Sequence, residues 1–176
     1  IDELNLEVRL SPPRSTKLGD FKVSKEKGYT ISINNDLNLY SSLITLTHEI
    51  AHAFVWDRYK RSVFPHGNEW KNTYQSLMSN FLNDQIFPID LLNLLRKHFA
   101  NPKASTTTDI SLYKCLREFD YRKIITISDI DNGDIFLLKN GKRFIKGEKL
   151  RKRFKCQEYS SKKIYLVHPL AEVIRI

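Results

Sequence analysis

The spacing of apolar and polar residues changes period along the chain and separates it into three regions. Residues 4–10 alternate strictly between apolar and polar side chains, as a half-buried strand does. Residues 17–23 and 29–33 continue this strand-like pattern, and Lys27-Gly28 between them is typical of a hairpin turn. We therefore expect a short antiparallel sheet in the N-terminal part of the chain.

Helical periodicity replaces this alternation in the second region. Apolar residues recur three or four positions apart over residues 40–59, which predicts one long helix. A second helix is predicted from an N-cap at Asn68 to about residue 82. A third is predicted over residues 88–99, so that about three helices follow the sheet.

The third region follows a stretch of small polar residues without periodicity at 100–109, which is the best candidate for a linker. Two Asn-Gly pairs beyond it predict tight turns. Strand-like segments occur at residues 124–127, 134–138, 143–145, 153–156 and 164–167. The pattern predicts an α+β protein with one domain at residues 1–105 and a small β-rich subdomain at residues 106–176.

Composition limits the class of protein. The chain has 176 residues, 41% hydrophobic and 28% charged, which suits one domain with a small appendage. No apolar run approaches the roughly 20 residues that span a bilayer, so we expect no membrane association. The first residues lack the pattern of a signal peptide, and two cysteines suit a reducing compartment. We expect a cytoplasmic, nucleoid-associated protein and favour a monomer.

The positive charge is concentrated near the C-terminus. Residues 139–163 contain eleven Lys or Arg against two Glu, which accounts for the whole net charge of +9. Such a segment favours an anionic partner, and cations interleaved with Phe144 and Phe154 suit single-stranded nucleic acid. The alternative is a solvated surface with both Phe in a β core. The candidate nucleic-acid-binding residues are Lys142, Arg143, Lys146, Lys149, Arg151, Lys152, Arg153 and Lys155.

The helix predicted over residues 40–59 carries a His-Glu-x-x-His motif. His48 and His52 are four residues apart, so their imidazoles lie on one helix face and can bind a single zinc ion. Glu49 leaves the same turn, where a carboxylate can accept a proton from water. Ionisable residues in an apolar helix are costly without a partner, which favours a metal site over two unrelated histidines.

A third ligand comes from outside that helix, and His66 is the residue we favour. A metzincin would need Gly at position 55 and His at 58, but the chain has Val55 and Arg58, so that class is excluded. A gluzincin would take its third ligand from a carboxylate on the next helix, and Glu69 could supply it. We favour a supporting role for Glu69, either as a carboxylate that contacts a metal ligand or as a negative charge at the helix N-terminus.

Two stretches carry a family resemblance: LTHEIAHA at residues 46–53 and PHGNEW at residues 65–70. They resemble the SprT-like metallopeptidases, which include bacterial SprT proteins and eukaryotic Spartan. Residues 17–21 and 31–34 also resemble the strands that precede the motif in that family. The resemblance covers roughly residues 4–100.

The resemblance implies a minimal zincin domain with one catalytic zinc ion held by His48, His52 and His66. It also implies that Glu49 is the catalytic carboxylate of a zinc peptidase. Spartan-type members cut proteins crosslinked to DNA, so we expect a DNA-associated endopeptidase that acts on DNA-bound or DNA-crosslinked proteins. The alternative is a non-catalytic, zinc-braced nucleic-acid-binding or adaptor protein, for which a carboxylate at position 49 would be unnecessary.

The two cysteines depart from the family pattern. Many SprT-like proteins have a C-terminal zinc ribbon with two C-x-x-C knuckles. Cys115 and Cys156 stand where each knuckle could begin, but Glu118 and Tyr159 occupy the second positions. Two thiolates cannot complete a four-cysteine site. We expect a metal-free β-hairpin or small barrel instead, with both cysteines as small buried apolar residues.

Overall fold

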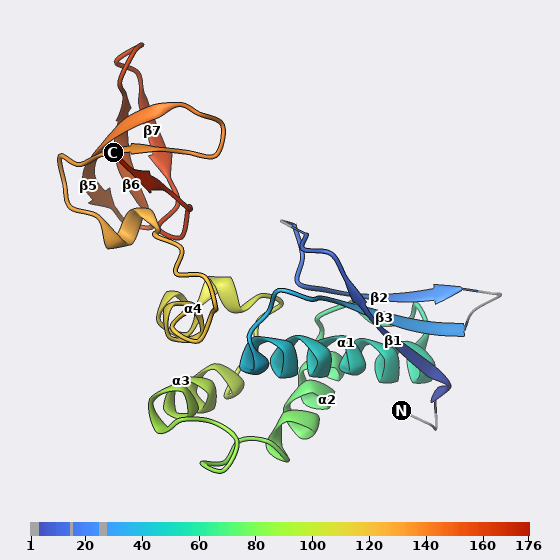
Figure 1. Cartoon of the computed structure of the whole chain (residues 1–176). Coiled ribbons are helices and arrows are strands. Elements are labelled where there is room, and N and C mark those ends of the chain that lie inside the picture. Colours follow the sequence, from blue (N-terminus) through green and yellow to red (C-terminus); the bar gives the residue numbers. More distant parts are fainter. Residues whose placement is uncertain (1–3, 15, 25–27) are drawn as a thin grey trace. The chain divides into compact units, whose positions relative to one another are not determined.

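In the computed structural model, which describes residues 4–14, 16–24 and 28–176, the three N-terminal strands form one sheet (Figure 1). They are β1 (Leu6–Ser11), β2 (Gly19–Ser24) and β3 (Gly28–Asn34), in the order β1-β3-β2. β2 pairs with β3 in antiparallel register, as expected, but β1 pairs with β3 in parallel. The prediction of a purely antiparallel sheet was therefore wrong.

The mixed pairing has a physical reason in the central strand. β3 is the most buried of the three, and its Ile31 and Ile33 are almost fully buried. Pro12-Pro13 end β1 and prevent a tight hairpin, so the chain reaches β2 through a longer loop and leaves room for β3 between them. Gly28 has a φ of +67°, as the predicted turn requires, whereas Lys27 lies outside the described residues.

Four helices follow this sheet along the chain, where about three were expected. They are α1 (Leu39–Tyr59), α2 (Asn68–Ser79), α3 (Ile89–Phe99) and α4 (Ile110–Arg117). α2 begins one residue earlier than predicted, with Gly67 at the N-cap, and ends at Ser79. The α+β class predicted from the sequence is confirmed.

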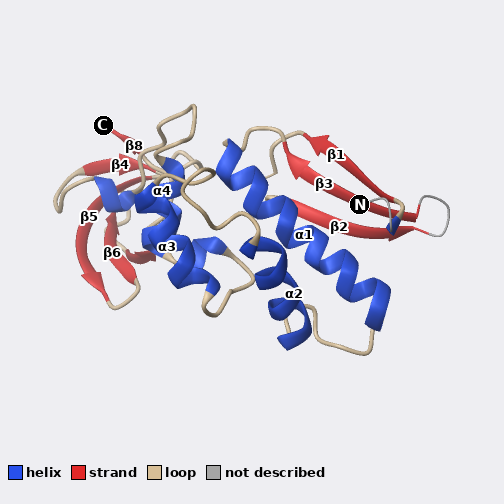
Figure 2. Ribbon diagram, turned by 90° about the horizontal axis from the view of Figure 1, so that it is seen from below, coloured by secondary structure: helices blue, strands red, loops and turns tan. Residues whose placement is uncertain are grey.

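Helix α1 is the centre of this unit because it is covered on two sides. Ala53 packs with Leu6, Ile31 and Ile33 of the sheet. Ile44, Ala51 and Val55 pack instead with residues of α2, α3 and α4. Figures 1 and 2 show the sheet on one side of α1 and α2 on the other. The helix that carries the His-Glu-x-x-His motif is thus held along most of its length.

Helix α4 was not predicted, because the sequence after residue 109 was interpreted as strands. Asp109 caps it by accepting a hydrogen bond from the Leu112 backbone N–H at 3.2 Å. Leu112 and Leu116, four residues apart, are both buried. A 3-10 helix, Thr106–Thr108, precedes it within the expected linker. The first compact unit therefore runs from Ile1 to Tyr121, past the boundary placed after residue 105.

Asn38 connects the start of α1 to the C-terminal end of this first unit. As the N-cap of α1, its side chain accepts a hydrogen bond from the Ser41 N–H at 2.9 Å. Its amide also donates to the Leu116 carbonyl of α4 at 2.9 Å and to the carboxylate of Asp120. The Asn38 side chain is buried, and its bond to Leu116 is buried with it, whereas the bonds with Ser41 and Asp120 are partly buried.

The second unit, Arg122–Ile176, is a five-stranded antiparallel sheet. The strand order is β7-β6-β5-β4-β8, with β4 (Ile135–Leu137), β5 (Arg143–Leu150), β6 (Arg153–Glu158), β7 (Ile164–Val167) and β8 (Ile174–Arg175). The predicted Asn-Gly turn between β4 and β5 is confirmed, with a φ of +78° at Gly141. Its core includes Phe136, Phe144 and Cys156.

Residues 124–127 do not form the predicted strand. Thr126 makes a single bridge to Glu172, and a 3-10 helix, Ile127–Asp129, follows at once. The cause is a capping box. The Thr126 side chain accepts a hydrogen bond from the Asp129 backbone N–H, and the Asp129 carboxylate accepts one from the Thr126 backbone N–H at 2.9 Å.

Within the described residues, none of the helices combines the length and apolar character that a membrane crossing requires.

Candidate metal centre

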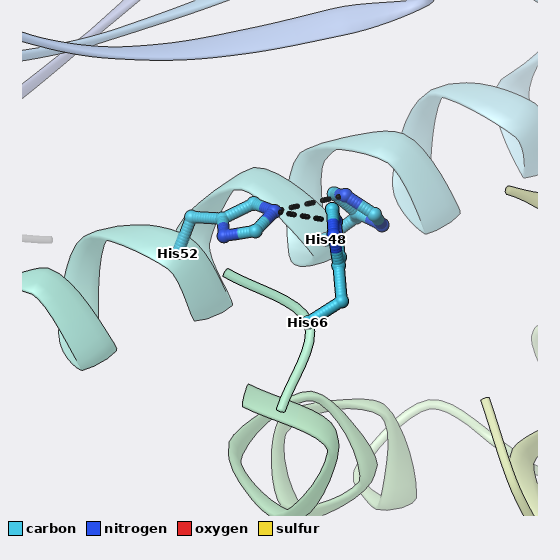
Figure 3. A group of neighbouring side chains, drawn as sticks. All are labelled: His48, His52 and His66. Atoms are coloured by element: carbon cyan, nitrogen blue, oxygen red, sulfur yellow. Dashed lines mark hydrogen bonds between the residues drawn. The ribbon is translucent and has the colours of Figure 1, made fainter. Parts of the chain in front are cut away.

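Three imidazoles converge on one point beside α1. His48 and His52 lie on successive turns of that helix, and their Nε2 atoms are 3.2 Å apart. His66 comes from the turn before α2, and its Nε2 lies 3.1 Å from that of His52 (Figure 3). Among the described residues, these three are the group of His, Cys, Asp and Glu whose ligand atoms lie close enough to hold a metal ion.

The spacing of the three nitrogen atoms fits a tetrahedral metal site. Zinc binds histidine nitrogen at about 2.0–2.1 Å, which places two ligands at tetrahedral corners about 3.3 Å apart. The observed separations of 3.1 and 3.2 Å are close to this value. Three neutral nitrogen donors that leave a fourth corner open are the donor set of a catalytic rather than a closed structural site.

A short turn positions His66. The backbone N–H of Gly67 donates to the Phe64 carbonyl at 3.0 Å and closes the turn around the histidine. A side chain at position 67 would lie 3.1 Å from the Glu69 carboxylate and 3.2 Å from the Phe64 carbonyl. The absence of a side chain therefore lets α2 begin immediately after the third ligand.

Trp70 contacts all three histidines and is fully buried. Its ring stacks on His52 with centroids 5.3 Å apart and meets His48 and His66 edge-on, each at 4.7 Å. Its indole N–H points at the His48 carbonyl at 3.4 Å. One rigid side chain of α2 thus fixes the orientation of the whole group. From the sequence, Trp70 was noted only as the last residue of the PHGNEW stretch that carries the family resemblance.

The histidines are neutral at physiological pH. Burial, followed by the charges of the other imidazoles, lowers the pKa of His48 to about 3. Burial and the charge of His66 lower the pKa of His52 to about 4, and burial also lowers that of His66. Since only neutral imidazole binds a metal, the folded chain holds its donors in the required form.

Glu49 lies on α1 between the first two histidines and faces β2. It is only 7% exposed. Burial, and less strongly the Asp20 carboxylate, raises its pKa to about 7. A backbone hydrogen bond from Phe21 acts in the opposite direction. A carboxyl with such a pKa exchanges a proton readily near neutral pH.

Gly19, the first residue of β2, was missed from the sequence and allows the strand to approach Glu49. A Cβ atom there would lie 2.7 Å from a carboxylate oxygen of Glu49 and 2.7 Å from the methyl group of Thr45. No real Cβ tolerates such contacts. A glycine inside a strand pattern often marks a close approach of this kind, so the signal was present.

The loop between β1 and β2 is tied to the end of β3, which fixes the start of β2. Arg14 donates to the side chains of Asn34 and Ser32 at 2.8 and 3.0 Å. Asn34 in turn donates to the carbonyls of Arg14 and Lys17, each at 3.1 Å. This network holds the backbone immediately before Gly19.

Glu69 and Tyr74 lie near the site without joining it. Glu69 is in the first turn of α2, and its carboxylate is not part of the ligand group found among the described residues. Its position agrees with a charge at the helix N-terminus. The Tyr74 hydroxyl donates to the Ile44 carbonyl at 3.1 Å and is buried, which raises its pKa. It therefore braces α1 against α2.

The candidate cations of the C-terminal segment fall into two groups. Lys142 forms an ion pair with Glu158 at 2.9 Å, and Lys146 is buried, with its ammonium donating to the Ile130 carbonyl. The expectation that Lys146 contacts a partner was therefore wrong, whereas Lys142 is exposed and its charge is offset by Glu158. The other six are exposed: Arg143, Lys149, Arg151, Lys152, Arg153 and Lys155.

Phe144 and Phe154 belong to the core of the second unit, with 2% and 9% of their surfaces exposed. The alternative that placed both rings in a β core is confirmed, and the use of either ring for base stacking was wrong. Strand alternation explains this, because Phe144 and Lys146 share the inner face of β5.

The two cysteines lie in separate units. Cys156 is fully buried in β6, as predicted, and Cys115 is half-buried on α4. Burial raises the pKa of both thiols. Both therefore remain protonated and unreactive near neutral pH.

Comparison with known proteins gives one match. The model of the SprT-like family matches residues 3–92, just over half of the chain. This segment contains the sheet, α1, α2 and all three histidines of the cluster. Searches of curated proteins and of solved structures found no match.

Proposed function

The chain belongs to the SprT-like family, and from this membership and the histidine cluster we propose that it is a zinc-dependent endopeptidase. The observation that carries the proposal is the buried carboxylate of Glu49, which directly follows His48 on α1, together with the three converging imidazoles. A site that only braced a fold would close its fourth position with another ligand and would need no acid there. The non-catalytic adaptor is therefore the weaker alternative.

In this proposal His48, His52 and His66 hold the ion, and Trp70 keeps their rings in place. A bound zinc ion would polarise the peptide carbonyl and acidify a water molecule. Glu49 accepts the proton of the attacking water and then donates it to the leaving amine. Its low exposure and its contact with β2 hold the carboxylate in one position for both transfers.

Strand β2 is the proposed guide for the substrate. It is an edge strand of the N-terminal sheet, so one row of its backbone groups has no strand partner among the described residues. Gly19 and Phe21 of the same strand contact Glu49. An extended polypeptide that pairs with this edge would pass close to the carboxylate. Backbone pairing of this kind selects unfolded or flexible segments rather than a particular sequence.

DNA is the proposed partner of the second unit, and DNA-bound or DNA-crosslinked proteins are the proposed substrates. The support is the group of six exposed cations, since a cluster of Lys and Arg attracts the phosphate backbone. The preference for single strands that the sequence suggested depended on Phe144 and Phe154. Because both rings are buried, we propose DNA without that preference.

A cleavage assay tests this function. We expect the zinc-loaded protein to cut an unfolded protein, and to cut a DNA-binding protein faster when DNA is added. Removal of the metal with a chelator should abolish both activities, and added zinc should restore them. Cleavage that continues after metal analysis shows the ion to be gone would contradict the proposal.

Replacement of Gly19 with Ala should lower activity without loss of metal. The new Cβ would lie 2.7 Å from the Glu49 carboxylate, so the carboxylate or β2 must move. A misplaced catalytic group can cost about 100-fold in rate. We expect kcat to fall towards that extent while zinc content stays that of wild type. Val23→Ala, an exposed position of the same strand, is the control and should behave as wild type.

A further inference from the structure

The hairpin between β5 and β6 extends beyond the rest of its sheet. β4 pairs with β5 only over residues 143–145, and β7 pairs with β6 only over residues 154–157. Lys149 pairs with Phe154, which still pairs with Val167 of β7, whereas Leu150 and Arg153 pair only with each other and form the two-stranded end of the hairpin. Figure 2 shows β5 running into this turn and returning as β6. We call residues 147–153 the β-ribbon.

The backbone of the β-ribbon has a defined shape. The register of β5 on β6 shifts between Lys146 and Lys149, which marks a β-bulge. Gly147 permits it, because a Cβ atom there would lie 2.4 Å from the Lys155 carbonyl oxygen. At the tip, Arg151 adopts a φ of +44°, a left-handed conformation that glycine usually supplies. The tip of the hairpin thus has an arginine at a position where the backbone conformation favours glycine.

Some cations of the second unit have acidic partners, whereas others, including Arg143, Lys155 and those of the β-ribbon, form no ion pair among the described residues. Lys139, Lys142 and Arg175 are paired with Glu172, Glu158 and Asp134 at 2.5, 2.9 and 3.1 Å. Lys149, Arg151 and Lys152 are exposed, and in the part of the chain that the structure describes no ion pair involves them. Between them Leu150 is 47% exposed. These cations surround an exposed aliphatic side chain. Such a surface fits a polyanion that has negative charge on its outside and apolar groups within a groove.

Duplex DNA meets these requirements. Its major groove is about 12 Å wide and about 8.5 Å deep and admits a two-stranded β-ribbon. The two residues of β5 beyond the bulge, Lys149 and Leu150, extend about 7 Å, which is close to that depth. Phosphates line the groove, and thymine methyl groups offer apolar contacts on its floor. The β-ribbon contains no aromatic residue that could stack on an unpaired base.

We propose that the β-ribbon enters the major groove of duplex DNA, with Lys149, Arg151 and Lys152 on the phosphates and Leu150 facing the bases. This deepens the proposed function, because it names the form of DNA and the element that holds it. Binding is measured without cleavage, so the result does not depend on whether the chain is a peptidase.

The test compares two triple variants that remove the same charge from the full chain. Lys149→Gln/Arg151→Gln/Lys152→Gln changes the β-ribbon. Lys139→Gln/Lys142→Gln/Arg175→Gln changes cations that are already paired. Binding of a short labelled duplex, and of one of its strands alone, is followed by fluorescence anisotropy over a series of salt concentrations. Circular dichroism checks that both variants are folded.

We expect the β-ribbon variant to reduce the salt dependence of duplex binding by about 2.7 in the slope of log K against log salt, the value for three lost phosphate contacts. The paired-cation variant should leave that slope unchanged. Leu150→Ser should weaken duplex binding severalfold without changing the slope. Equal losses in both triple variants, or equal losses for duplex and single strand, would overturn the proposal. Loss of binding to anionic phospholipid vesicles with duplex binding intact would assign the β-ribbon to a membrane surface instead.

Discussion

Replacement of Glu49 with Gln should reduce peptidase activity by about 100- to 10,000-fold, the range that a general acid–base group contributes. Glutamine has nearly the same volume and fits the close contact with Gly19, so the fold should be unchanged. It cannot accept the proton of the attacking water. The three imidazoles are untouched, and zinc content should remain that of wild type.

The measurement pairs peptidase kinetics with metal analysis of the same sample. Glu69→Gln is the matched control, because its carboxylate lies in the first turn of α2 outside the ligand group. It should retain activity. Full activity of the Glu49→Gln protein with zinc bound would remove Glu49 from the mechanism. Absence of peptidase activity in the wild-type protein under every condition would instead favour the zinc-braced adaptor.

The second large effect is expected from Trp70→Ala. The side chain is fully buried and contacts all three histidine rings, so its removal leaves a cavity beneath the metal site. Loss of a buried Trp costs about 3–5 kcal/mol of unfolding free energy. The imidazoles also lose the surface that orients them. We therefore expect a lower melting temperature and weaker binding of zinc.

Calorimetry with and without zinc separates these two effects. In the wild-type protein zinc should raise the melting temperature, because an ion that binds only the folded state stabilises it. That increase should shrink in Trp70→Ala. Trp56→Ala is the control, since Trp56 is half-buried on α1, where Arg61 lies over its ring. An undiminished zinc effect in Trp70→Ala would show that the ring does not position the ligands.

Local patterns predicted the helix with its motif, because both depend on residues close together in the sequence. His48 and His52 share a face through helical spacing alone, and the position of His66 just before α2 followed from the N-cap predicted at Asn68. The parallel pairing of β1 was missed because it depends on which strand is buried in the middle of the sheet. α4 was missed because Leu112 and Leu116 make its apolar face in only two positions, and a short helix offers little periodicity.

The basic segment shows where sequence reasoning about charge fails. Counting cations cannot reveal that Lys142 pairs with Glu158, because their contact depends on the register of β5 and β6. The burial of Lys146, in contrast, could have been predicted from the sequence. It lies two residues after Phe144 and so on the same face of the strand, where an apolar ring indicates the core.

The hydrogen bonds of Asn38 limit where this chain can be joined to another protein in a chimaera. The match to the SprT-like family ends at residue 92, yet the N-cap of the helix that carries the His-Glu-x-x-His motif bonds to Leu116 and Asp120. The segment that matches the family is therefore shorter than the compact unit in which it folds. A chimaera that joins this metal centre to another C-terminal unit would need its junction after Tyr121, so that α1 keeps the partners of its first turn.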